Sequence, residues 1–182
     1  SALMPLTNAN SGWFHMYSKE SGVGKTVSLR AVAGIGGNPD LVRMQERDTV
    51  AFRLNRAEIY RNIPWAVDEI TNMETKEYSN LVYQITQGQQ RGRMSGSGNH
   101  ERRRGKPWQL LAISTGNASI IEKLQAGKSS PQAEAQRTLE CHVPRVFTSS
   151  DEKELTDAFE NALRVNYGHA GPLFVQFVIQ NL

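Results

Sequence analysis

The stretch SKESGVGKTVS, residues 18–28, constrains the fold of this chain more than any other short segment. Its GKT, residues 24–26, completes the pattern G-x-x-x-x-G-K-[ST], in which a glycine-rich loop between a strand and a helix cradles phosphates. Lys19 stands where that pattern has its first glycine. Small residues at 21, 22 and 24 still let backbone N–H groups surround an anion at the positive end of a helix. The alternative is a strand–turn–helix corner that merely favours glycine.

This loop pattern predicts which residues contact a nucleotide. Lys25 would reach the β- and γ-phosphates of ATP, and the hydroxyl of Thr26 would ligate Mg²⁺. We therefore expect ATP and Mg²⁺ as ligands. The nucleotide-binding residues predicted in the loop are Ser21, Gly22, Val23, Gly24, Lys25 and Thr26.

Four apolar segments have the length and composition of strands: residues 12–18, 63–69, 108–115 and 137–143. A brief further strand is predicted over 41–45, and segments with helical spacing lie between the strands. Buried strands that alternate with helices predict an α/β fold, a three-layer sandwich in which a mostly parallel sheet is flanked by helices. In such sheets ligands bind where the strands end, so residues after 18, 67 and 113 are the candidates for chemistry.

Local signals predict where several helices begin and end. Asp48 is expected to cap a helix over 49–62, because its carboxylate can accept free N–H groups of the first turn. Gly88 is expected to end a helix that begins near residue 73. Ser149 and Glu152 have the spacing of a capping box at the start of another helix. The stretch 128–136 is expected to be a loop.

Two acids, Asp68 and Glu69, close the second strand directly after the apolar run 64–67. Buried carboxylates are unfavourable unless a cation or positive group accompanies them. We expect Asp68 to hold Mg²⁺ through water, and Glu69 to orient and deprotonate the attacking water. The alternative is a pair of acids that caps a helix.

Polar residues also follow the third strand. Asn117 or Thr115 could hydrogen-bond the γ-phosphate or the attacking water and so sense hydrolysis. The alternative for Asn117 is a cap on the helix predicted over 118–124.

Length and composition limit the remaining choices. The 182 residues suffice for one domain, so we expect a single P-loop domain over 1–182, excised from a longer protein. The net charge of +3 does not by itself indicate nucleic-acid binding. Cys141 stands alone in the sequence, which excludes an internal disulfide, fits a reducing compartment and favours a small core residue. No apolar run is long enough to span a membrane, and the N-terminus lacks the features of a signal peptide.

Three motifs in this order resemble the P-loop ATPases with an acid-pair Walker B, the RecA/AAA+-like group that contains the superfamily III helicases. Blocks along nearly the whole chain are similar to the phage and plasmid primase-helicase ATPases, part of which has been a domain family of unknown function. The blocks are WFHMYSKESGVGKTVSLRAVA, IPWAVDEI, LVYQITQGQQRGRM, KPWQLLAISTGN, QRTLECHVP and YGHAGPLFVQFV. The resemblance implies a cytoplasmic protein of a bacterium or a phage-infected host.

The resemblance also implies a ring, usually a hexamer, with ATP between neighbours and an arginine finger supplied by the next subunit. The first candidate for that finger is Arg137, and Arg91 and Arg93 are the others. The alternative for each arginine is a solvated surface charge.

The polar stretch 89–107 is predicted to be a basic loop or hairpin insertion, because SGSGN at its centre suits a hairpin tip. In superfamily III helicases this interval carries a hairpin that grips DNA. The residues predicted to bind single-stranded or forked DNA are Arg91, Arg93, His100, Arg102, Arg103, Arg104 and Lys106. The alternative is a solvated loop. Trp13, Trp65 and Trp108 lie in predicted strands and are expected in the core.

These features favour an ATP-driven DNA helicase or translocase core of a phage or mobile-element replication protein. One alternative is a small-molecule kinase whose arginine-rich lid corresponds to residues 91–106. Another is a ring-forming scaffold in which Lys19 has compromised turnover. A GTP-dependent switch is disfavoured, because no N-K-x-D-like segment appears.

Overall fold

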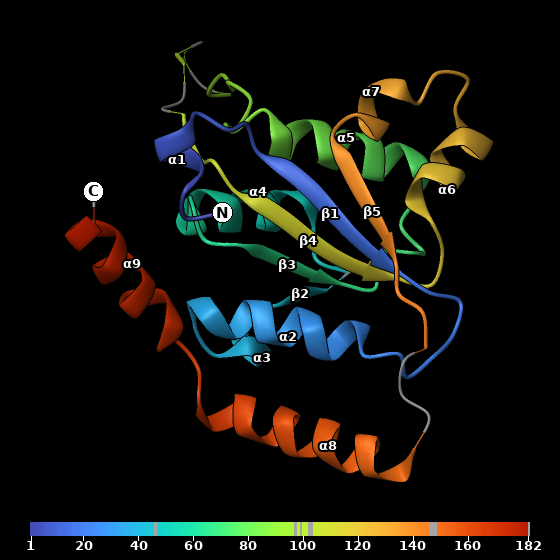
Figure 1. The fold of residues 1–182 in the computed structure, drawn as a ribbon. Helices are drawn as coiled ribbons and strands as arrows, with labels where there is room; N and C mark the ends of the chain where they lie inside the picture. The colour runs from blue at the N-terminus through green and yellow to red at the C-terminus, as the bar shows by residue number, and fades with distance from the viewer. Residues whose placement is uncertain (46, 97, 99, 102–103, 146–148, 182) are drawn as a thin grey trace.

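A five-stranded parallel sheet forms the centre of the molecule, in the order β2-β3-β4-β1-β5 (Figure 1). The structure is a computed structural model and describes residues 1–45, 47–96, 98, 100–101, 104–145 and 149–181. The strands are β1 (Gly12–Tyr17), β2 (Met44–Gln45), β3 (Trp65–Asp68), β4 (Leu111–Gly116) and β5 (Thr138–His142). This parallel sheet flanked by helices confirms the predicted α/β fold.

The described helices cover both faces of the sheet (Figure 1). They are α1 (Met4–Thr7), α2 (Lys25–Gly36), α3 (Pro39–Val42), α4 (Val50–Tyr60), α5 (Thr75–Thr86), α6 (Ile120–Gly127), α7 (Gln132–Ala135), α8 (Ser150–Val165) and α9 (Ala170–Asn181). On one face lie α2 and α3, and α8 packs outside α2 through an ion pair of 3.1 Å between Arg30 and Glu160. On the other face lie α4, α5 and α6.

Alternation along the strands builds two cores, one on each face. Trp13 and Trp65 point to the face of α4 and α5, where their rings meet edge to face at 5.5 Å. The intervening positions point to the face of α2, where Ala66 and Ile113 pack against Leu29 and Ala33. All three tryptophans are at most 2% exposed, which confirms that they belong to the core.

Several element boundaries differ from those expected. The helix cap is Thr49, whose Oγ1 accepts the N–H of Phe52 at 3.3 Å, because α4 begins one residue later than predicted. Asp48 instead accepts the N–H of Gln45. The strand expected over 41–45 is shortened to the two residues of β2. Asn38 and Pro39 start the short helix α3, which includes residues 41 and 42. The strand expected over 108–115 begins at Leu111.

Two further expectations are wrong. The stretch 128–136 contains the short helix α7, whose four residues give no periodic signal in the sequence. Cys141 is exposed rather than buried, because β5 lies at the edge of the sheet. The capping box at the start of α8 is confirmed: the Ser149 N–H donates to Glu152 at 2.9 Å.

The last helix, α9, leaves several large apolar side chains exposed, among them Leu173, Phe177 and Ile179. It is nevertheless a short helix. Within the described ranges, no helix combines the length and the apolar character needed to cross a membrane.

Candidate active site

Strands β1, β3 and β4 end at the same edge of the sheet, at the lower right in Figure 1. Because β4 lies between the other two, the segments that follow the three strands converge there. We call this the carboxyl edge. The opposite side, where the strands begin, is the amino edge.

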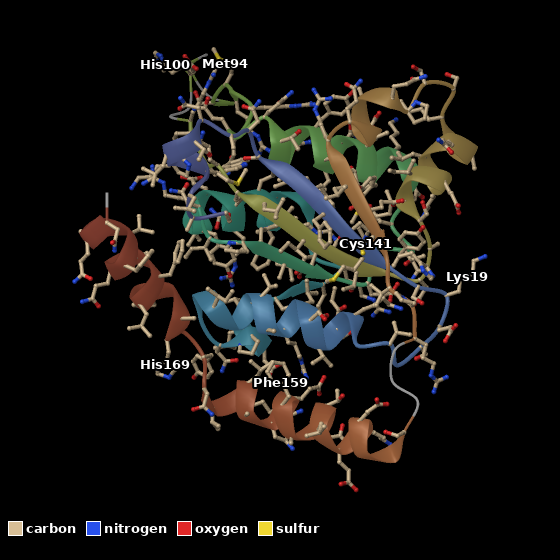
Figure 2. All side chains as sticks on the ribbon, viewed as in Figure 1. Lys19, Met94, His100, Cys141, Phe159 and His169 are labelled. Carbon is tan, nitrogen blue, oxygen red and sulfur yellow. The ribbon has the colours of Figure 1, made fainter. Side chains whose placement is uncertain are left out.

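At the carboxyl edge, the loop after β1 turns through two glycines with positive φ, +74° at Gly22 and +88° at Gly24. Helix α2 begins immediately after Gly24, so its free N–H groups open toward the loop. The buried ammonium of Lys25 donates to the carbonyls of Ser18 at 2.9 Å and Glu20 at 3.1 Å. Lys19 is exposed, and its side chain lies on the outside of the loop (Figure 2). Lys19, although it replaces the first glycine of the pattern, therefore does not occupy the space inside the loop.

Asn117 follows β4 and faces the loop. Its Oδ1 accepts from the Nζ of Lys25 at 3.4 Å, and its backbone N–H donates to Thr71 Oγ1 at 2.6 Å. The cap of α6 is Ser119, whose Oγ accepts the N–H of Glu122 at 3.0 Å. The alternative of Asn117 as the helix cap is therefore wrong, and its amide belongs to the carboxyl edge.

The two acids after β3 have different surroundings. Asp68 accepts from Thr115 Oγ1 and from the guanidinium of Arg43, each at 2.6 Å. Glu69 has a φ of +50°, which is rare for a residue with a side chain, and its N–H donates to Thr115 Oγ1 at 3.1 Å. Glu69 Oε1 is buried and has no hydrogen-bond partner among the described residues. Asp68 is thus fixed by two partners, whereas Glu69 presents an oxygen that can accept a proton.

A cavity of about 670 Å³ lies beside the loop, Glu69 and Asn117, whereas Asp68 does not line it. Its lining includes the predicted residues Ser21, Gly22, Val23, Gly24, Lys25, Thr26, Glu69 and Asn117. Helix α8 forms the opposite wall, and an adjoining hollow of 330 Å³ adds the apolar side chains Leu155 and Phe159. The volume is that of a small-molecule site, with a polar end at Lys25 and an apolar end at Phe159.

Several basic residues near this edge were missed by the sequence analysis, among them Lys153 on α8, which lines the cavity. Arg145 lines the cavity, and Arg43 pairs with Asp68. The rule that ligands bind after strand ends could have found Arg145, because it follows the strand predicted over 137–143. Arg43 gave no signal, because it precedes a strand of two residues.

The predicted magnesium ligands are Thr26, which lines the cavity, and Asp68, which Thr115 connects to Glu69. In the described part of the chain, His, Cys, Asp and Glu do not form any group of three or more that could hold a metal ion. One carboxylate and one hydroxyl nevertheless suit Mg²⁺, which keeps waters and uses substrate phosphates as its other ligands.

Arg137, the first candidate for a finger, lies at the amino edge, just before β5. Its guanidinium stacks over the ring of Tyr83 at 4.8 Å and donates to the Ala133 carbonyl at 2.6 Å. It lines a separate hollow of 470 Å³ with Asn10 and Gln136. The structure therefore does not bring Arg137 to the cavity of its own chain.

The basic stretch also lies toward the amino edge, where Figure 2 shows Met94 and His100 at the upper left. An antiparallel bridge joins Met94 to Glu101, and the Ser95 N–H donates to the His100 carbonyl at 2.8 Å. Arg102 and Arg103 lie outside the described residues. The other predicted DNA-binding side chains are all exposed: Arg91, Arg93, His100, Arg104 and Lys106.

The sheet and the glycine-rich loop after β1 together define a parallel α/β fold. A solved structure described as "SCCmec type IV Cch - active helicase" has a similar fold, with a TM-score of 0.66 and 22% sequence identity. The chain belongs to the family described as Domain of unknown function (DUF927), whose model matches residues 1–105. The match to the solved structure covers 98% of this chain but only 31% of that one. Comparison with curated proteins gives no match.

Proposed function

We propose that this domain hydrolyses ATP to drive movement on DNA, as the helicase or translocase core of a phage or mobile-element replication protein. The observation that carries the proposal is the buried Oε1 of Glu69, which has no hydrogen-bond partner in the described part of the chain, in the same cavity as Lys25. A carboxylate in that place can serve as a general base beside a phosphate site.

ATP would enter the cavity with its phosphates at the loop. The N–H groups around Gly22 and Gly24 and the ammonium of Lys25 supply positive charge for the β- and γ-phosphates. The adjoining hollow at Val27, Leu155 and Phe159 offers apolar surface to the base. The loop thus suits the phosphates of a nucleotide, and the adjoining hollow suits its base.

Mg²⁺ would be held by Thr26 and, through water, by Asp68. When bound, the ion neutralises negative charge on the phosphates. Asp68 is suited to this task because Thr115 and Arg43 already fix both of its oxygens in place.

Hydrolysis needs a base, a water and a leaving group. Glu69 accepts a proton from the attacking water, whose oxygen bonds to the γ-phosphorus while the bond to the oxygen of ADP breaks. The side chain of Asn117, held 3.4 Å from Lys25, can bond the γ-phosphate and respond when it leaves. The products are ADP and phosphate.

A neighbouring copy would complete the site. Arg137 is at the amino edge, so it can reach a γ-phosphate only in another subunit, as in the predicted hexameric ring. The exposed basic side chains of the same edge would bind the phosphates of single-stranded or forked DNA.

The alternative of a small-molecule kinase is weaker. Its arginine-rich lid was assigned to residues 91–106; the described residues of this range lie toward the amino edge and do not line the cavity (Figure 1). A lid must cover the phosphates that it protects. The non-catalytic scaffold remains a separate outcome of the experiment below.

The proposal is tested by release of phosphate from ATP with no acceptor present, with and without single-stranded DNA. We expect DNA to stimulate release, and Lys25→Ala to reduce it by about 100-fold or more, because a charged donor to the transition state is lost. The matched control is Lys19→Ala, an exposed lysine of the same loop, which should change the rate by less than about 2-fold because it leaves the cavity intact. ATP binding without release would indicate a scaffold, and formation of ADP with transfer of the phosphoryl group to an added acceptor, without free phosphate, would indicate a kinase.

A further inference from the structure

A buried histidine lies directly behind the segment that carries Asn117. His15, on β1, is 0% exposed. The sheet register places it between Ser114 on β4 and Glu140 on β5. The hydrolysis proposed above does not use this side chain, although a polar residue fully inside a sheet must have partners.

Hydrogen bonds determine which ring nitrogen of His15 carries the proton. Nε2 lies 3.1 Å from the carbonyl oxygen of Ala118, which can only accept, so Nε2 is the donor. Burial lowers the pKa of His15, so the ring is neutral at pH 7 and Nδ1 is an acceptor. Ser114 Oγ, 2.9 Å from Nδ1, donates to it and accepts from Trp13 Nε1 at 2.8 Å. The tautomer with its proton on Nε2 therefore satisfies the hydrogen bonds of Trp13, Ser114 and His15 together.

The segment after β4 is held at three successive points. Thr71 Oγ1 accepts the N–H of Asn117, His15 donates to the carbonyl of Ala118, and Glu140 accepts the N–H of Ile121 at 3.0 Å. The middle contact fixes the peptide between Ala118 and Ser119, one peptide beyond the one that follows Asn117. The ring of His15 also packs closely against the end of β4, because a Cβ on Gly116 would lie 2.9 Å from Cε1 of His15.

We propose that His15 is a positioning residue for Asn117: its Nε2–H holds the Ala118 carbonyl and thereby directs the Asn117 amide toward Lys25. The inference rests on the proposed function, because Asn117 acts on the γ-phosphate only if the cavity holds ATP. A histidine that served only the core would stabilise the fold without affecting the phosphate site.

Two substitutions separate the two ring nitrogens. In His15→Gln the amide nitrogen can replace Nε2 and still donate to Ala118. In His15→Asn the shorter side chain can bond Ser114 but cannot reach Ala118. We expect His15→Asn to lower kcat by about 10-fold or more with ATP affinity unchanged, because small displacements of a positioned group are costly in rate. His15→Gln should retain kcat within about 3-fold, because it keeps the donor to Ala118.

A double-mutant cycle tests whether His15 acts through Asn117. If it does, His15→Asn should change kcat by less than about 2-fold in an Asn117→Ala background, because the group that it positions is already gone. Binding of a fluorescent ATP analogue and circular dichroism report affinity and folding for each variant. Losses of kcat that multiply in the double variant would overturn the inference and leave His15 a core residue.

Hydrogen exchange gives a second readout that needs no turnover. The amides of residues 117–121 should exchange faster in His15→Asn than in His15→Gln, because only the former frees the Ala118 carbonyl. Equal exchange in the two variants would overturn the inference. A wild-type protein that neither binds ATP nor releases phosphate would instead overturn the proposed function, so the two failures are distinguishable.

Discussion

The carboxyl edge and the amino edge of the sheet hold their polar side chains in contrasting ways. At the carboxyl edge, Lys25 is only 9% exposed and Asp68 has two partners at 2.6 Å. Toward the amino edge, the described basic side chains of residues 89–107 are exposed, and Arg104 pairs with Glu101 only at 3.5 Å. Reaction chemistry needs groups held in place, whereas binding to a uniform chain of phosphates needs mainly charge. The carboxyl edge therefore suits the proposed hydrolysis of ATP, and the amino edge suits the proposed binding of DNA.

The largest effect is expected at the carboxyl edge, from Glu69→Gln. The amide keeps the shape of the side chain but cannot accept the proton of water, so turnover should fall by about 10³-fold. Binding of ATP should persist, because the loop is unchanged. Phosphate release and binding of a fluorescent ATP analogue measure the two quantities.

The matched control for that variant is Glu74→Gln, an exposed carboxylate that precedes α5 and makes no capping bond with its side chain. It removes the same charge outside the cavity, and turnover should stay within about 2-fold of wild type. Normal hydrolysis by Glu69→Gln would exclude Glu69 as the base and remove the contrast between the edges.

A smaller effect is expected from Arg91, Arg93 and Arg104 changed together to Ala. Each phosphate contact contributes about −0.9 to the slope of log K against log salt for duplex DNA and about −0.7 for single strands. Loss of three contacts should flatten that slope by about 2 for single-stranded DNA, while basal ATP hydrolysis is unaffected. Fluorescence anisotropy at a series of salt concentrations measures it.

The control for the basic variant changes Arg47, Lys76 and Arg164 to Ala. These residues are also exposed and lie outside the basic stretch, so the net charge changes equally. A slope that flattens as much in the control as in the basic variant would assign the effect to net charge. The amino edge would then have no special role.

The smallest effect is a pH dependence of stability from His15. Burial lowers its pKa below the ordinary 6.5, against opposing contributions from the hydrogen bond to the Ala118 carbonyl and from Glu140, while Lys25 lowers it further. Below pH 6.5 the unfolded chain therefore binds the proton first, and stability falls as pH falls toward the folded pKa. The loss can reach about 1.4 kcal/mol per pH unit.

Thermal unfolding between pH 7.5 and 5.5 measures this loss. His15→Gln is the control, since it cannot titrate, and its unfolding should depend less on pH than that of wild type. Equal pH dependence in the two proteins would mean that other groups dominate.

The sequence predicted the sheet and the side of the cavity formed by the strand ends, because both follow from local patterns, but it did not predict the wall formed by α8. Apolar runs such as the one ending at Val67 predict strands, and the chemistry of parallel sheets lies at strand ends. The glycines of the loop and the acids after β3 could therefore be assigned to one edge of the sheet from the sequence alone.

The remaining contacts depend on distances across the sheet, which no local pattern encodes. Arg43 meets Asp68 only because β2 pairs with β3. His15 looked like part of a buried strand, and its partners come from residues about a hundred positions away. Cys141 was misjudged because a sequence pattern does not tell an edge strand from a central one.

Gly116 has a consequence for how this family can vary. A Cβ at that position would lie 2.5 Å from Thr71 Oγ1 as well as against His15, so the three positions compete for one small volume. A homologue with alanine at the equivalent of 116 should therefore carry smaller residues at the equivalents of 15 or 71. Such covariation would indicate that the close packing of positions 15, 71 and 116, next to Asn117, is kept in related proteins.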